Sequence, residues 1–457
     1  MSLSSLALDS FHQNKPSTQI NINGETFMIA LDLNWIRSQF PALTQEINGQ
    51  PTIFCDGPGG TQVPKAVVDA ISDYLLTSNA NAHGAFATSQ RTDALIAAAR
   101  DAVADFLNCD SDEVVFGANM TTLTYTISRA IGRALQPGDE IIVTALDHYA
   151  NVCSWQALAE QGIVVRTVDI HPEDCTLNWE ELTRSLNERT KLVAIGYASN
   201  AVGTINDVAK IAQLAHQVGA WVFIDAVHYA PHGAIDVQAL DCDFLVCSAY
   251  KFFGPHLGIL YGKREHLARL QPYKVLPAPD EVPSRWETGT QNYEGMAGLL
   301  ATLGYLTELG HRVDPSGQNR RAALTAVTAA IHTHEAELSQ ALLRGLLEVP
   351  GLTIYGIIEL SRLSERTPTF GLRIKGYTPA ELATQLGDRG IFTWHGHFYA
   401  LGVIERLGLA ASGGLLRIGL VHYNTIDEVN RLLQALHEMT EPVGVGFANR
   451  LSSQHIS

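Results

Sequence analysis

Cysteine is scarce and scattered in this sequence. The chain has 457 residues but six cysteines, and none of them forms a Cys-x-x-Cys pair or the spacing of a zinc site. This pattern argues against a zinc-binding motif and against a disulfide framework in a chain of this length. We therefore expect buried, reduced thiols. The last cysteine is Cys247, so residues 248–457 contain no thiol.

Positive charge and long apolar runs are also in short supply. Lysine and arginine number 31 against 47 acidic residues, for a net charge of −16. Such a balance disfavours nucleic acid or an anionic membrane as a main partner. Residues 1–7 lack the basic region and apolar core of a signal peptide, and no apolar run is long enough to span a bilayer. A cytoplasmic protein is the expectation.

What the sequence does contain is a globular composition, with 46% hydrophobic and 17% charged residues. At about 150 residues per domain, the length predicts two large domains or three smaller ones. Apolar runs at residues 140–144, 190–196 and 220–224 alternate with helical patterns. Strands that alternate with helices predict an α/β fold with a mostly parallel sheet and crossover helices.

One lysine stands in unusual surroundings. The apolar run 244–247 leads to Ser248 and Lys251, and Phe252 and Phe253 follow directly. A lysine among apolar side chains is poorly solvated, which favours the neutral amine that attacks an aldehyde in Schiff-base enzymes. The plainer alternative is a strand-end lysine whose ammonium group reaches solvent.

A carboxylate upstream favours the first interpretation. The apolar run 220–224 ends in Asp225. Pyridoxal phosphate needs such a pair, because the carboxylate keeps the pyridine nitrogen protonated while the lysine binds the aldehyde carbon. A second polar turn, residues 117–122, lies between a strand and a helix and predicts an anion site at the helix N-terminus. Its Asn119 or Thr121 could instead simply cap that helix.

Taken together, these features resemble the fold-type I pyridoxal-phosphate enzymes of the class-V aminotransferase and cysteine desulfurase-like family. The resemblance covers roughly residues 50–440. It implies a large domain with a mostly parallel sheet of the seven-stranded type between helices, and a smaller α+β C-terminal domain. It divides the chain into an N-terminal segment (1–45), a large pyridoxal-phosphate domain (46–298), a small domain (299–445) and a tail (446–457).

The resemblance also assigns roles to individual residues. Lys251 would bind pyridoxal 5′-phosphate covalently, Asp225 would hold its ring nitrogen and His148 would stack on its ring. Other residues would contact the cofactor; these are Ala118, Asn119, Met120, Asn200, His228, Ser248, Tyr250 and, from the neighbouring subunit, Thr290. The last of these implies a homodimer. Tyr250 stands where relatives commonly have histidine, and its hydroxyl could donate in place of the imidazole.

The small-molecule substrate implied is an amino acid. Arg417 would pair with its α-carboxylate through a bidentate contact, and the alternative is a surface arginine at a strand end. His83 and Tyr399 would complete the substrate site. No metal is expected, because the pair His395 and His397 has no carboxylate or thiol nearby in the sequence.

The small-domain motif departs from the desulfurase pattern. Tyr399 stands in the place of the cysteine that becomes a persulfide, and Trp394 in the place of an arginine. A tyrosine cannot form a persulfide, so we expect a C–S lyase that acts by β-elimination on cysteine, cystine or a related amino acid. The alternatives are an aminotransferase or epimerase of another amino acid, and a non-enzymatic cofactor-binding protein. The presence of both Lys251 and Asp225 counts against the last.

Overall fold

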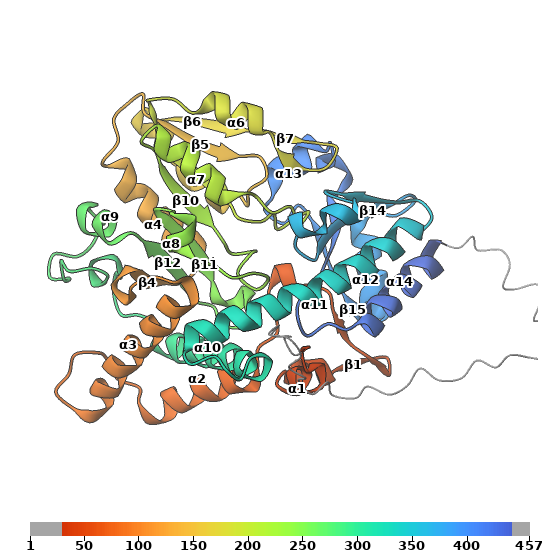
Figure 1. The fold of residues 1–457 in the computed structure, drawn as a ribbon, viewed down its shortest axis with the longest axis horizontal. Coiled ribbons are helices and arrows are strands. Elements are labelled where there is room, and N and C mark those ends of the chain that lie inside the picture. Colours follow the sequence, from red (N-terminus) through yellow and green to blue (C-terminus); the bar gives the residue numbers. More distant parts are fainter. Residues whose placement is uncertain (1–29, 441–457) are drawn as a thin grey trace, which may run out of the picture.

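The computed structural model describes residues 30–440. Two sheets organise them, a seven-stranded sheet in the first part of the chain and a four-stranded sheet in the last (Figure 1). The sequence also predicts a short strand at residues 20–24, and this strand and the expected tail (446–457) lie outside the described residues.

The larger sheet confirms the expected α/β fold. All neighbouring strands are parallel except β12, which is antiparallel to both of its neighbours. The strands are, in spatial order, β4 (Val114–Gly117), β12 (Gly258–Gly262), β11 (Phe244–Ser248), β10 (Trp221–Asp225), β9 (Thr190–Gly196), β5 (Glu140–Thr144) and β6 (Val164–Val168).

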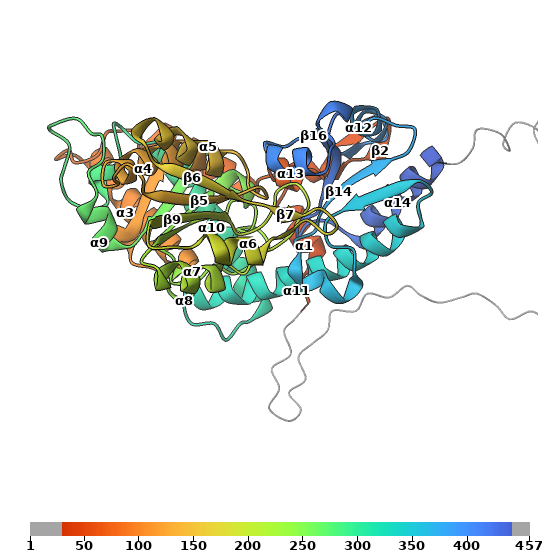
Figure 2. The ribbon, with the colours of Figure 1, turned by 90° about the horizontal axis from the view of Figure 1, so that it is seen from above.

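Helices cover both faces of this sheet, which explains why its strands read as continuous apolar runs. Seen from above, α4 (Met120–Gly132) and α5 (Ala150–Gln156) lie on one face, and α7 (Val208–Gln217) and α10 (Tyr293–Val313) on the other (Figure 2). Successive residues of β10 enter different cores, Ile224 with α7 and α10, and Phe223 with α4 and α5. This is the two-residue period of a strand buried on both sides.

The smaller sheet is antiparallel and supports the C-terminal part of the chain. Its strands are, in spatial order, β13 (Leu352–Tyr355), β14 (Thr369–Ile374), β17 (Leu415–Gly419) and β16 (Trp394–Gly396). Three helices bury its apolar face; they are α11 (Arg320–Glu348), α12 (Pro379–Asp388) and α14 (Ile426–Thr440). The long helix α11 runs from the large sheet's layer to this sheet (Figure 1).

Three elements differ in their bounds from what the apolar pattern predicts, which is one strand over 391–395, a helix from residue 91 and a helix with Ala134 on its apolar face. Residues 391–396 instead form β15 (Ile391–Phe392) followed by β16, because the two parts pair with different strands. Helix α3 (Ala87–Leu107) begins before residue 91. Helix α4 ends at Gly132, so Ala134 lies beyond it and is exposed.

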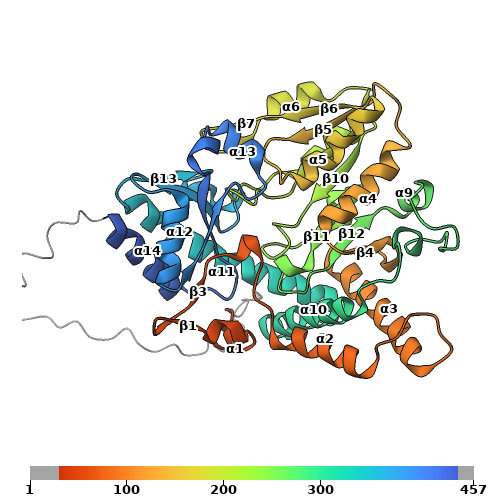
Figure 3. The same ribbon diagram turned by 180° about the vertical axis from the view of Figure 1, so that it is seen from behind.

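The two sheets are joined by more than one connection. Strand β3 (Ile53–Phe54) pairs in parallel with β15, so this early segment of the described chain lies beside the C-terminal sheet (Figure 3). The boundary expected between residues 298 and 299 falls inside α10. The domain division 46–298 and 299–445 therefore stays a prediction. Within residues 30–440, no helix combines the length and apolar character that crossing a membrane requires.

Candidate active site

The candidate site lies where the central strands of the large sheet end. Asp225 closes β10, Ser248 closes β11, and Lys251 follows in a short 3-10 turn, Ala249–Lys251. The carboxyl edge of an open α/β sheet is where ligands bind in such folds. The Lys251 amine donates a hydrogen bond to the Pro58 carbonyl, in the glycine-rich loop that follows β3.

Burial and neighbouring charges shift the pKa values of Lys251 and Asp225, the two residues that the sequence predicts to hold the cofactor. Burial and the positive charge of Arg417 lower the pKa of Lys251 to about 7, against the opposing effect of Asp225 and Asp56. Burial raises the pKa of Asp225 to about 6, although the Val227 amide donates to its Oδ1 at 2.9 Å. At pH 7 the carboxylate is therefore largely ionised while a sizeable fraction of Lys251 is neutral.

His148 is held by a buried network around Asp147. The Asp147 carboxylate accepts hydrogen bonds from the Gly196 amide at 2.8 Å and the Asn151 amide group at 3.0 Å, which ties the start of α5 to β9. The Ala150 amide donates to His148 Nδ1 at 3.1 Å. Burial, Lys251 and Arg417 lower the pKa of His148 to about 4, so the imidazole is neutral and its hydrogen lies on Nε2.

The turn before α4 contains the helix cap that the sequence allows. Asn119 caps the helix, since its side-chain oxygen accepts from the Thr122 amide at 2.9 Å. The Met120 amide donates to Ser248 Oγ at 3.0 Å, which joins the helix N-terminus to the end of β11. The Ser248 hydroxyl thus lies at the positive end of a thirteen-residue helix, and the anion site expected there stays a prediction.

Arg417 lies in β17 and is buried, with 4% of its surface exposed. Its Nη1 donates to the Asn200 carbonyl at 2.8 Å, and its guanidinium packs 4.2 Å from the centre of the Phe398 ring. Burial lowers its pKa to about 9, so it keeps its charge at pH 7. Arg417 Nε and Asn200 Oδ1 are both buried with no hydrogen-bond partner among residues 30–440. Buried polar atoms are normally paired, so these two indicate a polar ligand.

The small-domain loop brings Tyr399 to the same place. The Tyr399 ring stacks on His148 with 5.4 Å between ring centres. The Tyr149 amide donates to the Tyr399 carbonyl at 2.7 Å, and the Asn200 side chain donates to the Phe398 carbonyl at 2.8 Å. The loop after β16 is thus attached to the large sheet through β5 and β9, the strands that precede Tyr149 and Asn200.

Two further residues expected at the cofactor lie close to this group. His228 is buried with its Nε2 3.2 Å from Thr367 Oγ1, and burial holds the pKa of this histidine well below its usual value. Tyr250 stacks on His256, and the Lys251 amine lies 4.8 Å from the centre of the Tyr250 ring.

Thr290 and His83 lie apart from these contacts. Thr290 is exposed on the loop before α10. The His83 side chain is exposed and pairs with Asp93 at 3.1 Å; among the described residues, no hydrogen bond or ion pair joins it to Lys251 or Arg417. The substrate role of His83 stays a prediction.

Asp56, Phe398 and Thr367 belong to the site but were not expected from the sequence. Asp56 follows β3 in the loop that contacts Lys251; burial raises its pKa to about 6, while Arg417 and Lys251 act against that rise. A carboxylate directly after an apolar strand was the signal that identified Asp225, and the same signal precedes Asp56. Phe398 and Thr367 carry no comparable signal, because ordinary loop residues have the same types.

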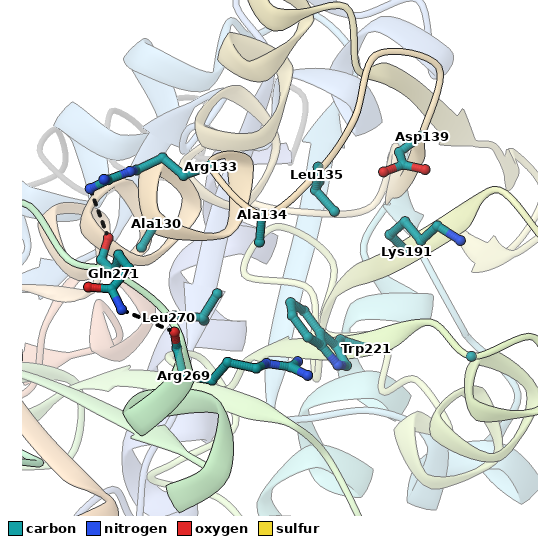
Figure 4. A pocket seen from close by; sticks show the side chains of 11 residues that line it. Ala130, Arg133, Ala134, Leu135, Asp139, Lys191, Trp221, Arg269, Leu270 and Gln271 are labelled. Atoms are coloured by element: carbon teal, nitrogen blue, oxygen red, sulfur yellow. Dashed lines mark hydrogen bonds between the residues drawn. The ribbon is translucent and has the colours of Figure 1, made fainter.

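A separate hollow lies at the opposite edge of the large sheet (Figure 4). Its floor is formed by Trp221 at the start of β10, with the Arg269 guanidinium 5.0 Å from that ring. Arg133, Lys191 and Asp139 also line it. It lies at the amino ends of the parallel strands, away from Lys251 and Asp225. Among residues 30–440, no three His, Cys, Asp or Glu side chains are grouped to hold a metal.

Comparisons with known proteins agree with this architecture. Residues 53–432 match the family described as aminotransferase class-V. A probable cysteine desulfurase from Halalkalibacterium halodurans is 32% identical over 90% of this chain and 99% of its own length. One from Synechocystis is 34% identical over 88% of this chain and 94% of its own. The apo structure of a cysteine desulfurase from Thermococcus onnurineus superposes with a TM-score of 0.79 at 27% identity, covering 90% of this chain and 98% of that one.

Proposed function

The chain belongs to the class-V aminotransferase family of pyridoxal-phosphate enzymes, and on that premise we propose that it is a C–S lyase that removes sulfur from an amino acid by β-elimination. The observation that carries the proposal is that the ring of Tyr399, in the loop after β16, stacks on His148, in the place where desulfurases would have a cysteine. No thiol occurs beyond Cys247. Elimination needs no persulfide-forming cysteine, which is why we favour it over desulfuration.

The residues present fit the cofactor. The unpartnered Asn200 Oδ1 is of the kind that a ring hydroxyl would engage, and the Ser248 hydroxyl at the N-terminus of α4 is of the kind that a phosphate would engage. Lys251 would hold the aldehyde carbon and Asp225 the ring nitrogen, with His148 on the ring face. When bound, pyridoxal phosphate supplies an electron sink that makes the Cα–H bond of an amino acid acidic.

The protein's own residues would do the rest. Arg417 keeps its charge while buried, so it can bind the α-carboxylate strongly and orient the amino acid. Lys251, with a pKa near 7, suits a general base and acid at Cα. In the overall reaction the Cα–H and Cβ–S bonds break, the sulfur leaves as a thiol with the proton, and water converts the remaining carbons to pyruvate and ammonia.

We also propose that the chain acts as a homodimer in which Thr290 reaches the phosphate site of the neighbouring subunit. The exposure of Thr290 supports this arrangement. So do the exposed apolar side chains of α2 (Lys65–Thr77), such as Leu76 at 84%, which a second copy could cover.

Product analysis tests the reaction. The cofactor-loaded protein is incubated with L-cysteine or L-cystine, and the carbon product is identified. Pyruvate with ammonia is the expected result. Alanine with released sulfur would overturn the proposal and require another sulfur acceptor. A keto acid formed without sulfur release, or racemised amino acid, would favour transamination or epimerisation.

A further inference from the structure

We propose that the substrate carries a flat, apolar side chain, an aromatic ring or its equivalent, and that Trp394 and Tyr399 select it. The inference rests on the proposed function, because it assumes that Arg417 binds the α-carboxylate and that the amino group faces Lys251.

Trp394 stands directly beside Arg417. The two residues are paired across β16 and β17, and side chains directly opposite each other in an antiparallel pair lie on the same face of the sheet. The indole packs against Gly59, where any side chain would collide with it. Gly59 adjoins Pro58, whose carbonyl accepts a hydrogen bond from the Lys251 amine. Trp394 therefore lies near both Arg417 and the loop that contacts Lys251, and 51% of its surface is exposed.

On the side of Arg417 away from Trp394, the neighbouring strand β14 leaves little room for a ligand. Across β14, Arg417 is paired with Gly371, and a Cβ there would lie 2.9 Å from the Ala201 carbonyl. Backbone of the large sheet's loop fills that space. On the other side of Arg417, Trp394 is half-exposed, so we expect a bound amino acid to extend its side chain toward Trp394 rather than toward Gly371.

Two consecutive aromatic residues bound the rest of this space. Phe398 packs on the Arg417 guanidinium and Tyr399 on His148. Both adopt left-handed backbone conformations, with φ of 53° and 58°, which is strained for bulky residues. The hydrogen bonds to their carbonyls from Asn200 and Tyr149 hold them there. Strain of this kind persists where the surrounding structure requires it, and here it presents aromatic rings to the site.

The exposure of these rings indicates what they bind. Tyr399 is 68% exposed and Trp394 is 51% exposed, and a flat apolar group stacked on either ring would cover it. The CH2–SH group of cysteine is too small to do so. For β-elimination the substrate class is thus an S-substituted cysteine with an aromatic substituent. The Cβ–S bond breaks, the substituent leaves as its thiol, and pyruvate and ammonia remain.

Binding can be measured without relying on elimination. L-Phenylalanine and L-alanine contain no leaving thiol, and their affinities for the cofactor-loaded protein follow from changes in its visible absorption. We expect phenylalanine to bind at least tenfold more tightly. Trp394→Ala and Tyr399→Ala should each reduce this preference severalfold, whereas Trp394→Phe should retain most of it. Tyr273→Ala is the matched control, since Tyr273 is 61% exposed but packs against Arg133, which lines the separate hollow.

Equal affinities for the two amino acids, or a preference unchanged in both alanine variants, would overturn the inference. A parallel assay compares pyruvate formation from S-benzyl-L-cysteine and L-cysteine, and faster release from the benzyl compound supports both proposals. If phenylalanine is preferred in binding but neither compound yields pyruvate, the selection by Trp394 and Tyr399 stands and the elimination reaction fails.

Discussion

Lys251 differs from the other lysines of the chain through what surrounds it. Its amine is removed from water and lies near three charged groups that act in opposite directions: Arg417 lowers its pKa, whereas Asp225 and Asp56 raise it. The result is a pKa of about 7. Because the neutral amine is the form that attacks an aldehyde, pH should control how fast the protein takes up its cofactor.

The rate of pyridoxal phosphate uptake by the cofactor-free protein should rise with pH and level off above about 7. Below its pKa, the neutral fraction of Lys251 falls tenfold for each pH unit. Arg417→Gln removes a neighbouring positive charge, so the pKa of Lys251 should rise. The bend of the rate profile, which is the pH at which the uptake rate levels off, should then move to higher pH. Rapid-mixing absorbance measurements between pH 5 and 9 give both profiles.

Asp56→Asn is the matched variant that should shift the pKa of Lys251 in the opposite direction. It removes a negative charge that raises the pKa of Lys251, so its bend should lie at lower pH than that of the natural protein. The ionisations of free pyridoxal phosphate are common to all three profiles and cancel in the comparison. Three profiles with the same bend would show that these charges do not act on Lys251.

Among the elements, helix α4 depends on a glycine in a neighbouring strand. A Cβ on Gly258 of β12 would lie 2.5 Å from the backbone of Asn119, the residue that caps α4. The helix N-terminus can therefore approach the end of β11 closely, where Met120 meets Ser248. This close approach is a backbone requirement that any side chain at position 258 would disturb.

Gly258→Ala should weaken the binding of pyridoxal phosphate about tenfold or more, because the phosphate-facing N–H groups must shift. Pyridoxal, which lacks the phosphate, should bind with nearly unchanged affinity. Gly304→Ala in α10 is the control, since a Cβ there meets nothing within 4 Å and alanine favours the helix. Equal losses for both ligands would point to a general folding defect and contradict the role of the α4 N-terminus.

The elements also show what the sequence can and cannot predict. The strands that end in Asp225 and Ser248 follow from apolar runs long enough to be buried on both faces, so their positions along the chain and the pair Asp225 and Lys251 could be predicted. The split of residues 391–396 into β15 and β16 could not, because it depends on β3 arriving from the far end of the chain. For the same reason Phe398 was missed: its contact with Arg417 exists only once the two sheets are assembled.

At the scale of the whole molecule, the site joins the two sheets, and the proposed dimer adds a second subunit. Lys251 follows the large sheet, Arg417 belongs to the small one, and the loop of Asp56 runs between them. Thr290 would be contributed by the other copy. Each complete site would then contain Lys251 of one chain and Thr290 of the other.

Mixed dimers test this arrangement. When Lys251→Ala and Thr290→Ala subunits are combined, one site of each heterodimer carries both substitutions and the other carries neither. We expect the mixture to recover activity above that of either variant alone, up to about a quarter of the natural protein's activity per subunit if subunits mix at random. No recovery, after exchange has been verified by differently tagged subunits, would contradict a Thr290 donated by the partner.

The central claim is that Lys251 binds pyridoxal phosphate covalently, and chemical trapping tests it most directly. The loaded protein is reduced with borohydride, digested and analysed by mass spectrometry. We expect a single phosphopyridoxyl group, carried by the peptide that contains Lys251, and none in Lys251→Ala. A label on another lysine, or no label after saturation with the cofactor, would contradict it.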